Sequence, residues 1–166
     1  ALVTRGISRD ELREFCAFSE ISIINTTNEQ GVPLQTLCDL FTIWEKKGKI
    51  EGLKLAYVGK GSKNAVSLID GAIKCGMEVA VARPEEFKLD EFSLNDTRQY
   101  GNVLVTENPV EAVRNADIVY TDNYNYHSET TEREREILLP YQVNNSLMSY
   151  AAHNAQFMHS LPAKRG

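Results

Sequence analysis

Leu53-Lys54-Leu55-Ala56-Tyr57-Val58, followed directly by Gly59-Lys60-Gly61-Ser62-Lys63-Asn64, is the stretch that decides the fold. The first half is a short apolar run typical of a buried strand, and the second is a glycine-rich turn that opens a helix. Free N–H groups at such a helix start attract anions. The glycine spacing matches neither a P-loop nor a dinucleotide fingerprint. The stretch therefore predicts one strand–turn–helix unit of an α/β sheet with polar chemistry at its turn.

The same alternation extends to both sides of this unit. Further strand patterns are found at residues 22–24, 78–82, 102–106, 117–121 and 156–158. Helical patterns are found at residues 9–18, 34–47, 64–75, 109–115, 130–138 and 144–154. Strict alternation of this kind requires right-handed crossovers between parallel strands. The sequence therefore predicts an α/β fold with a doubly wound parallel sheet.

A domain boundary is expected at the end of the long helical pattern at 34–47. A polar break and two glycines, Gly48 and Gly52, mark the junction. We expect residues 48–166 to form the doubly wound sheet, and residues 1–47 to be the tail of a second α/β domain with its linking helix.

Composition narrows the class of protein. The 166 residues are 42% hydrophobic and 25% charged, with a formal net charge of -5, as in ordinary globular proteins. This acidic balance lacks the basic patch that binds nucleic acid, and the charge run at 132–136 alternates in sign like a solvated helix face. No window is long and apolar enough to span a bilayer, and residues 1–5 carry no secretory leader. We expect a cytoplasmic protein without nucleic-acid or membrane partners.

The three cysteines are odd in number and widely spaced. Cys16, Cys38 and Cys75 each lie in a helix-like apolar pattern. This favours buried, reduced thiols over disulfides or a metal site.

Polar side chains gather after several predicted strands. Asp122 and the pair Tyr126-His127 follow the strand at 117–121, and His159-Ser160-Leu161 follows the last one. Open α/β sheets bind ligands at the carboxyl ends of their strands. We therefore expect these side chains to share one site.

In this order, the motifs resemble those of the aspartate and ornithine carbamoyltransferases, and the ornithine branch most closely. The resemblance runs from end to end, with Pro-x-Gln at 33–35, Gly-x-Gly at 59–61, the run at 116–122, Tyr-Gln-Val-Asn at 141–144 and Phe-Met-His-x-Leu-Pro-Ala at 157–163. It implies transfer of a carbamoyl group from carbamoyl phosphate to an amine, with the active site between two α/β domains. It implies no metal or organic cofactor, and trimers formed through the first domain.

The resemblance also implies roles for individual residues. Gln35 would act at the carbamoyl group, Asp122 would hold the acceptor amine, and the His159-Ser160-Leu161 turn would contact both substrates. Further substrate contacts are implied for Arg5, Lys63, Asn64, Tyr126 and His127. On this reading residues 1–47 belong to the carbamoyl-phosphate domain and residues 48–166 to the acceptor domain. Structural roles compete with these: Gln35 and Asp122 as helix caps, and His159 as a strand-end histidine.

The chain also departs from the family pattern. Val32 replaces the histidine of His-Pro-x-Gln, Lys60 an aspartate, Lys63 an asparagine and Ser160 a cysteine, while residues 126–128 replace Ser-Met-Gly. Two explanations compete. Either Lys60, Lys63 and His127 suit a more acidic acceptor, or the site is catalytically inactive and binds a ligand or partner; solvated lysines are the simpler alternative. The family's Ser-x-Arg-Thr phosphate motif is not among these residues, so we expect a fragment of a longer chain.

Overall fold

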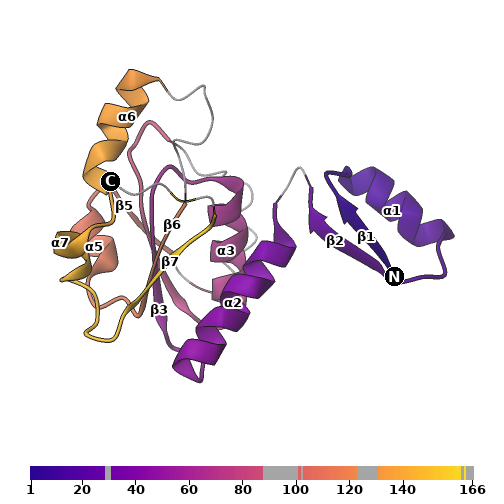
Figure 1. The fold of residues 1–166 in the computed structure, drawn as a ribbon, viewed down its shortest axis with the longest axis horizontal. Coiled ribbons are helices and arrows are strands. Elements are labelled where there is room, and N and C mark those ends of the chain that lie inside the picture. Colours follow the sequence, from indigo (N-terminus) through magenta and orange to yellow (C-terminus); the bar gives the residue numbers. More distant parts are fainter. Residues whose placement is uncertain (29–30, 88–100, 102, 123–130, 162, 164–166) are drawn as a thin grey trace.

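The computed structural model describes residues 1–28, 31–87, 101, 103–122, 131–161 and 163. A five-stranded parallel sheet with helices on both faces forms the larger part (Figure 1). A smaller unit, made of two strands and one helix, lies beside it. Helix α2 (Pro33–Lys47) follows the smaller unit and packs against the larger one.

The large sheet has the strand order β5-β4-β3-β6-β7. Its strands are β3 (Lys54–Val58), β4 (Glu78–Ala82), β5 (Val103–Thr106), β6 (Ile118–Thr121) and β7 (Gln156–His159). Every neighbouring pair is parallel. The doubly wound sheet predicted from the sequence is confirmed.

Helices cover both faces of this sheet. On one face α2 and α3 (Lys63–Lys74) pack over Leu55, Tyr57 and Tyr120. On the other, α5 (Pro109–Val113) and α7 (Asn145–Met148) pack over alanines and valines of the central strands. Alternate residues of a buried strand point to opposite faces, so both cores draw on the same strands.

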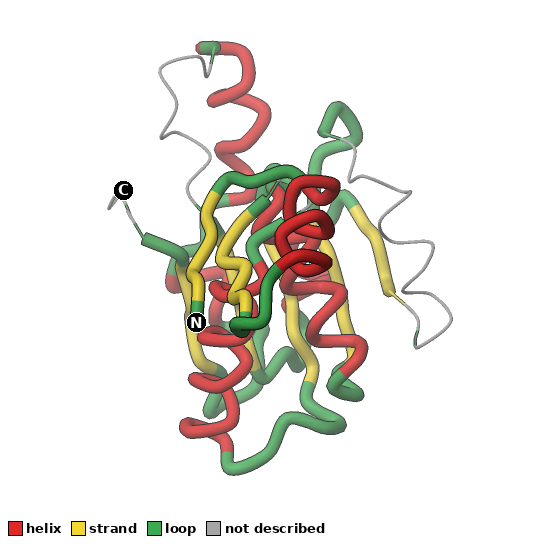
Figure 2. Tube along the Cα trace, turned by 90° about the vertical axis from the view of Figure 1, so that its right-hand side faces the viewer, coloured by secondary structure: helices red, strands yellow, loops and turns green. Residues whose placement is uncertain are grey.

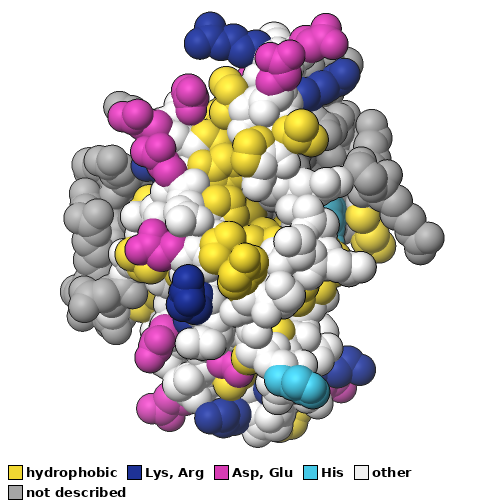
Figure 3. Space-filling model, turned by 90° about the vertical axis from the view of Figure 1, so that its left-hand side faces the viewer, with side chains coloured by type: hydrophobic (Ala, Val, Ile, Leu, Met, Phe, Trp, Pro, Cys, Tyr) yellow, Lys and Arg dark blue, Asp and Glu magenta, His cyan; other side chains and the backbone are white. Residues whose placement is uncertain are grey.

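Two short helices complete this unit. Helix α6 (Glu132–Leu138) leads into the 3₁₀ helix η1 (Leu139–Tyr141). Charged side chains of both signs gather at the top of Figure 3, where α6 lies, so the alternating run at 132–136 is largely exposed as predicted.

The smaller unit comprises β1 (Leu2–Arg5), α1 (Arg9–Phe18) and β2 (Ile23–Thr27), with the two strands parallel. Figure 2 looks from its side, with the unit in front of the large sheet. A capping box between Ser8 and Glu11 starts α1. No residue of α1 is buried, and Phe18 is 85% exposed. The helix predicted at 9–18 is therefore confirmed. In the described part of the chain, no further element covers its outer face, so most of its side chains stay exposed.

Several predictions need correction. The cysteines are unpaired as expected, but Cys16 and Cys38 are exposed and Cys75 is only partly buried, because α1 and the outer face of α2 are uncovered. The helical pattern at 144–154 yields only α7, and a turn at residues 149–150 follows it. Strand β1 has no counterpart among the predicted strands. No helix in the described part of the chain is long and apolar enough to cross a membrane.

Candidate functional site

Asp122, one of the predicted site residues, lies where the strand order of the large sheet reverses. From β3 the chain continues to β4 and β5 on one side, and it returns to β6 and β7 on the other. The carboxyl ends of β3 and β6 flank this switch point, where open α/β sheets bind ligands. Tyr57 and Tyr120 are register partners on these two strands, and their rings lie 6.5 Å apart. Both are essentially fully buried.

Tyr57 holds the carboxylate of Asp122. Tyr57 Oη donates to Asp122 Oδ1 at 2.8 Å and accepts from the Gly61 N–H at 3.0 Å. Ser62 Oγ donates to Asp122 Oδ2, and it also caps α3 by accepting from the Ala65 N–H. Burial, and then the charge of Asp122, raises the pKa of the Tyr57 hydroxyl well above its usual value, so it remains a donor. Asp122 is only 5% exposed, which fixes its carboxylate at this edge.

Tyr120 makes a second tyrosine–aspartate pair. Its hydroxyl donates to Asp39 Oδ2 at 2.9 Å, and Gln35 Nε2 donates to Asp39 Oδ1 at 2.9 Å. Burial raises the pKa of Asp39, although the hydrogen bonds from Gln35 and Tyr120 oppose this shift. Burial, followed by the charge of Asp39, raises the pKa of Tyr120. Helix α2 is thereby tied to the centre of the large sheet.

The turn after β7 lies at the same edge of the sheet. Burial and then the charge of Asp39 raise the pKa of Tyr120, and Ser160 opposes this shift. His159 is the register partner of Thr121, so it lies one residue from Asp122 along the same edge. Its ring contacts Phe157, with centroids 6.4 Å apart, and its Nδ1 contacts the Ser160 carbonyl oxygen. Phe157 pairs with Val119 of the α5 face, whereas Tyr120 faces α2 and α3. His159 and Ser160 therefore start from opposite faces of the sheet.

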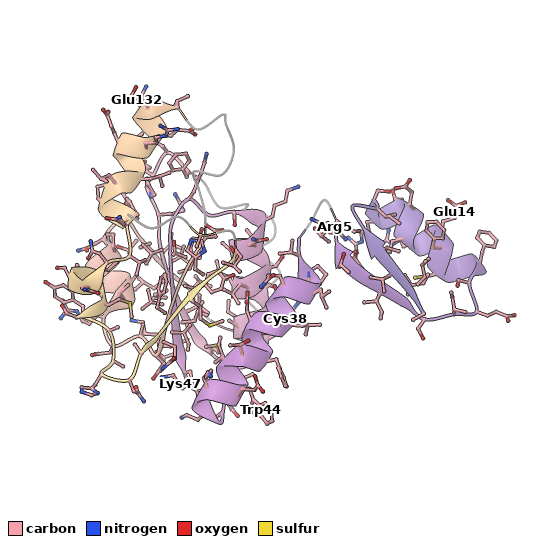
Figure 4. All side chains as sticks on the ribbon, in the orientation of Figure 1. Arg5, Glu14, Cys38, Trp44, Lys47 and Glu132 are labelled. Atoms are coloured by element: carbon pink, nitrogen blue, oxygen red, sulfur yellow. The ribbon has the colours of Figure 1, made fainter. Side chains whose placement is uncertain are left out.

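The other predicted residues lie on several different elements. Gln35 is in the first turn of α2 and is exposed, Lys63 is the exposed first residue of α3 with Asn64 beside it, and Leu161 is 86% exposed. Arg5 ends β1, at the end of its unit nearest to α2 (Figure 4). Among the described residues we find no hydrogen bond between Arg5 and the other predicted site residues. Tyr126 and His127 lie outside the described residues.

The position of Lys60 fits neither of the two roles considered for it, a solvated lysine or a cation for an acidic acceptor. Its Nζ pairs with Glu134 Oε1 of α6 at 3.0 Å and lies 4.7 Å from the centre of the Phe87 ring. Lys60 lowers the pKa of Glu134. Because its charge is already engaged by Glu134, Lys60 is neither simply solvated nor free to bind an acidic acceptor in this conformation.

Sequence reasoning missed four residues of this network: Asp39, Tyr57, Ser62 and Tyr120. Asp39 lies four residues after Gln35, which places both on one side of a helix. The tyrosines carried a weaker signal, since each is a polar-tipped residue inside an apolar strand and needs a buried partner. In the described part of the chain, no group of three His, Cys, Asp or Glu residues is placed to hold a metal ion.

This arrangement can bind an amine beside a polarised group. A carboxylate fixed by two hydroxyls retains lone pairs for a further donor. The α3 N-terminus, which begins at Ser62 beside Asp122, adds free N–H donors, and the Gln35 amide donates within the Asp39–Tyr120 pair. Such preorganised groups stabilise charge that develops during acyl transfer.

Comparison with known proteins agrees with this geometry. The family described as "Aspartate/ornithine carbamoyltransferase, Asp/Orn binding domain" matches residues 51–166. The ornithine carbamoyltransferase of Caldicellulosiruptor saccharolyticus is 38% identical over 172 aligned residues, which cover 99% of this chain and 56% of that protein. That of Hyperthermus butylicus is 40% identical, covering 100% of this chain and 55% of that protein.

Solved structures give the same result. The ornithine carbamoyltransferase of Pyrococcus furiosus superposes with a TM-score of 0.88 at 36% identity, covering 99% of this chain and 55% of that one. The enzyme from Gloeobacter violaceus gives 0.86 at 36% identity, covering 99% of this chain and 57% of that one. The chain thus spans about half the length of the relatives it matches. On this evidence the chain belongs to the aspartate/ornithine carbamoyltransferase family.

Proposed function

We propose that the protein carrying this chain transfers the carbamoyl group of carbamoyl phosphate to the amine of ornithine. The observation that carries the proposal is the likeness over the whole chain to proteins named ornithine carbamoyltransferase, at 38% identity over 99% of the chain for one of them. In this reaction the amine nitrogen attacks the carbonyl carbon, the bond to the phosphate oxygen breaks, and the amine loses a proton. The products are citrulline and inorganic phosphate.

We assign the acceptor amine to Asp122. Its carboxylate is held by Tyr57 and Ser62, so it presents its remaining lone pairs at the switch point of the sheet. Gln35 and Ser160 supply neutral donors for the carbamoyl oxygen. His159, Leu161, Lys63, Asn64 and Arg5, together with Tyr126 and His127, are assigned to the surrounding substrate contacts. Correct placement of two reactants in this way accounts for a large part of the rate of such bimolecular reactions.

The engaged charge of Lys60 disfavours the more acidic acceptor. Lys60 is paired with Glu134, so the described residues offer less positive charge than the sequence suggests. Nothing in the comparisons favours a protein that binds without turnover. Ornithine is therefore the acceptor we propose.

We further propose that residues 48–166 form the acceptor domain and residues 1–47 belong to the carbamoyl-phosphate domain. The family match at residues 51–166 supports this division. The family resemblance also supports a homo-oligomer, specifically a trimer. The exposed unpaired thiols of Cys16 and Cys38 support a reducing compartment such as the cytoplasm.

Citrulline formation tests the proposal. The full-length protein should convert carbamoyl phosphate and ornithine to citrulline, and Asp122→Asn should lower kcat/KM by about a hundredfold or more, as loss of one preorganised polar group does. Asp117→Asn is the matched control, because Asp117 precedes β6 as Asp122 follows it and accepts from the Lys54 N–H at 2.9 Å. It should leave the kinetics unchanged. Absence of citrulline from the wild type, or full activity of Asp122→Asn, contradicts the proposal.

A further inference from the structure

Lys60 joins the glycine-rich turn after β3 to two other parts of the large unit. Its Nζ pairs with Glu134 Oε1 of α6 at 3.0 Å and lies 4.7 Å from the centre of the Phe87 ring. Phe87 follows β4, and its carbonyl oxygen accepts from the Arg83 guanidinium at 3.0 Å. The ammonium group is therefore held from two sides, by a carboxylate on one element and by an aromatic face on another.

The backbone around Lys60 has little stiffness of its own. Gly61 has a φ of 84°, and a β-carbon on Gly59 would lie 2.9 Å from Tyr57 Oη, so the turn needs glycine at both positions. The Gly59 N–H donates to the Ala82 carbonyl oxygen at 3.1 Å, which fixes the start of the turn. A residue between two glycines has many accessible backbone conformations. Contacts of the Lys60 side chain are well placed to select one of them.

The residues directly after Lys60 hold the carboxylate of Asp122. The Gly61 N–H donates to Tyr57 Oη at 3.0 Å, and Oη donates to Asp122 Oδ1 at 2.8 Å. Because a phenol has one proton, an N–H donor on its oxygen leaves that proton directed to the carboxylate. The next residue, Ser62, donates to the other oxygen of Asp122. The two hydroxyls that hold Asp122 therefore both depend on the position of this turn.

Glu134 is itself fixed at the start of α6. Its Oε2 accepts from the Thr131 N–H at 3.1 Å, and its own N–H donates to Thr131 Oγ1 at 3.2 Å. This reciprocal pair is the capping box of α6. One carboxylate therefore both starts the helix and receives Lys60, which sets the position of the turn relative to α6.

Stability alone is a weak reason for the pair of Lys60 and Glu134. Their side chains are 37% and 28% exposed. Ion pairs with this much access to water contribute little to stability. A pair that joins the turn holding Asp122 to a separate helix is better explained by geometry than by stability.

We propose that Lys60 is a positioning residue, whose pairing with Glu134 keeps the Gly61 N–H and the Ser62 hydroxyl in place to orient Asp122. The proposal rests on the proposed function, because Asp122 is assigned there to the acceptor amine. Lys60 contacts no substrate in this role. It acts through the turn, and its loss should therefore affect ornithine and not carbamoyl phosphate.

Steady-state kinetics of the full-length protein test the pair. Lys60→Met keeps a long unbranched side chain without the charge, and Glu134→Gln keeps an acceptor for the Thr131 N–H, as capping boxes allow. Each should lower kcat/KM for ornithine by about tenfold, within the loss of about a hundredfold that a misplaced group can cause. The KM for carbamoyl phosphate should stay at the wild-type value. The double variant should be no worse than the more damaged single variant, since both remove one interaction.

Two further variants serve as controls. Lys60→Arg keeps a cation for Glu134 and for the Phe87 ring, so it should retain most of the wild-type kcat/KM. Lys74→Met removes an ion pair of the same kind elsewhere, because Lys74 Nζ lies 2.8 Å from Asp70 Oδ2 on α3. It should leave the kinetics unchanged. Wild-type kinetics for Lys60→Met and Glu134→Gln, or an equal loss in either control, overturn the proposal.

A crystal structure of Lys60→Met separates this inference from the proposed function. We expect the Gly61 N–H to leave hydrogen-bonding distance of Tyr57 Oη and the Asp122 carboxylate to shift, while the sheet is unchanged. An unmoved turn overturns the positioning role whatever the activity. A wild type that forms no citrulline overturns the proposed function, and the position of the turn in the variant still decides for or against Lys60.

Discussion

The two sheet units of this chain use the same local pattern with opposite results. In the large unit, α3 between β3 and β4 buries six residues, among them Ile69 at 0% exposure. In the small unit, α1 between β1 and β2 buries none, and Phe18 is 85% exposed. Both helices begin with a side-chain cap and both join parallel strands. Local sequence is therefore sufficient for the element, whereas burial requires a second layer over the sheet.

The difference in burial between the two units also decides where polar side chains are fixed by hydrogen bonds. In the large unit the apolar layers exclude water from Tyr57 and Tyr120, so their hydroxyls must pair with Asp122 and Asp39. In the small unit the side-chain pair that caps α1, Ser8 and Glu11, is exposed. In the part of the chain that the structure describes, buried tyrosine–aspartate pairs are consequently found in the layered unit and not in the small one.

The largest expected difference in stability between the two units comes from shortening a buried side chain of the large unit. Leu55, in the central strand β3, is 0% exposed. Leu55→Ala should lower the free energy of unfolding of the 166-residue chain by about 2–5 kcal/mol, through lost burial and the cavity left behind. Urea unfolding monitored by circular dichroism measures this loss. Phe18→Ala in α1 should change the free energy of unfolding by less than about 0.5 kcal/mol. Equal losses for the two variants would break the comparison.

A smaller effect is expected at the junction of the two units. Gly31→Ala places a methyl group against Ser67 Oγ, so Ser67 must move and the hydrogen bond from the Val32 N–H is weakened. The expected loss is about 1–3 kcal/mol of unfolding free energy. Adding Ser67→Ala removes the overlapping oxygen and should recover part of this loss. If the double variant is less stable by the sum of the two single losses, the overlap is not the cause.

The smallest expected effect is the pH dependence of stability, which should have opposite signs for Asp39 and for Glu11. Burial raises the pKa of Asp39, so its contribution to stability is largest below the unfolded pKa and is lost as pH rises through the folded one. The hydrogen bonds from Ser8 lower the pKa of Glu11, so its contribution is present above the unfolded pKa and is lost as pH falls through the folded one.

Unfolding curves at pH 7 and pH 4 measure these signs. Relative to Asp39→Asn, the wild type should become more stable on acidification. Relative to Glu11→Gln, it should become less stable. The same sign for both comparisons would show that the two carboxylates are not in different environments.

The sequence alone predicted much of the fold, and its site residues stay predictions. The strands from Leu53 onward were found because a strand buried on both faces is an uninterrupted apolar run. β1 was missed because Leu2–Arg5 is short and carries polar residues. Asp122 and Ser160 were predicted as site residues from their place after strands. Tyr120 and Asp39 were not, because their pairing joins residues 81 positions apart and depends on which face of β6 meets α2.

The register between β3 and β6 sets the site as firmly as any single side chain. Leu55, Ala56 and Tyr57 pair with Ile118, Val119 and Tyr120. If β6 slipped by one residue, Tyr120 would exchange faces with Val119, and its hydroxyl would be carried to the alanine-lined side while the backbone ladder stayed complete. A protein misregistered in this way would keep its secondary structure but lose the hydrogen bond between Tyr120 and Asp39. Circular dichroism would therefore not detect the error, whereas the buried, unpaired Tyr120 hydroxyl would lower stability.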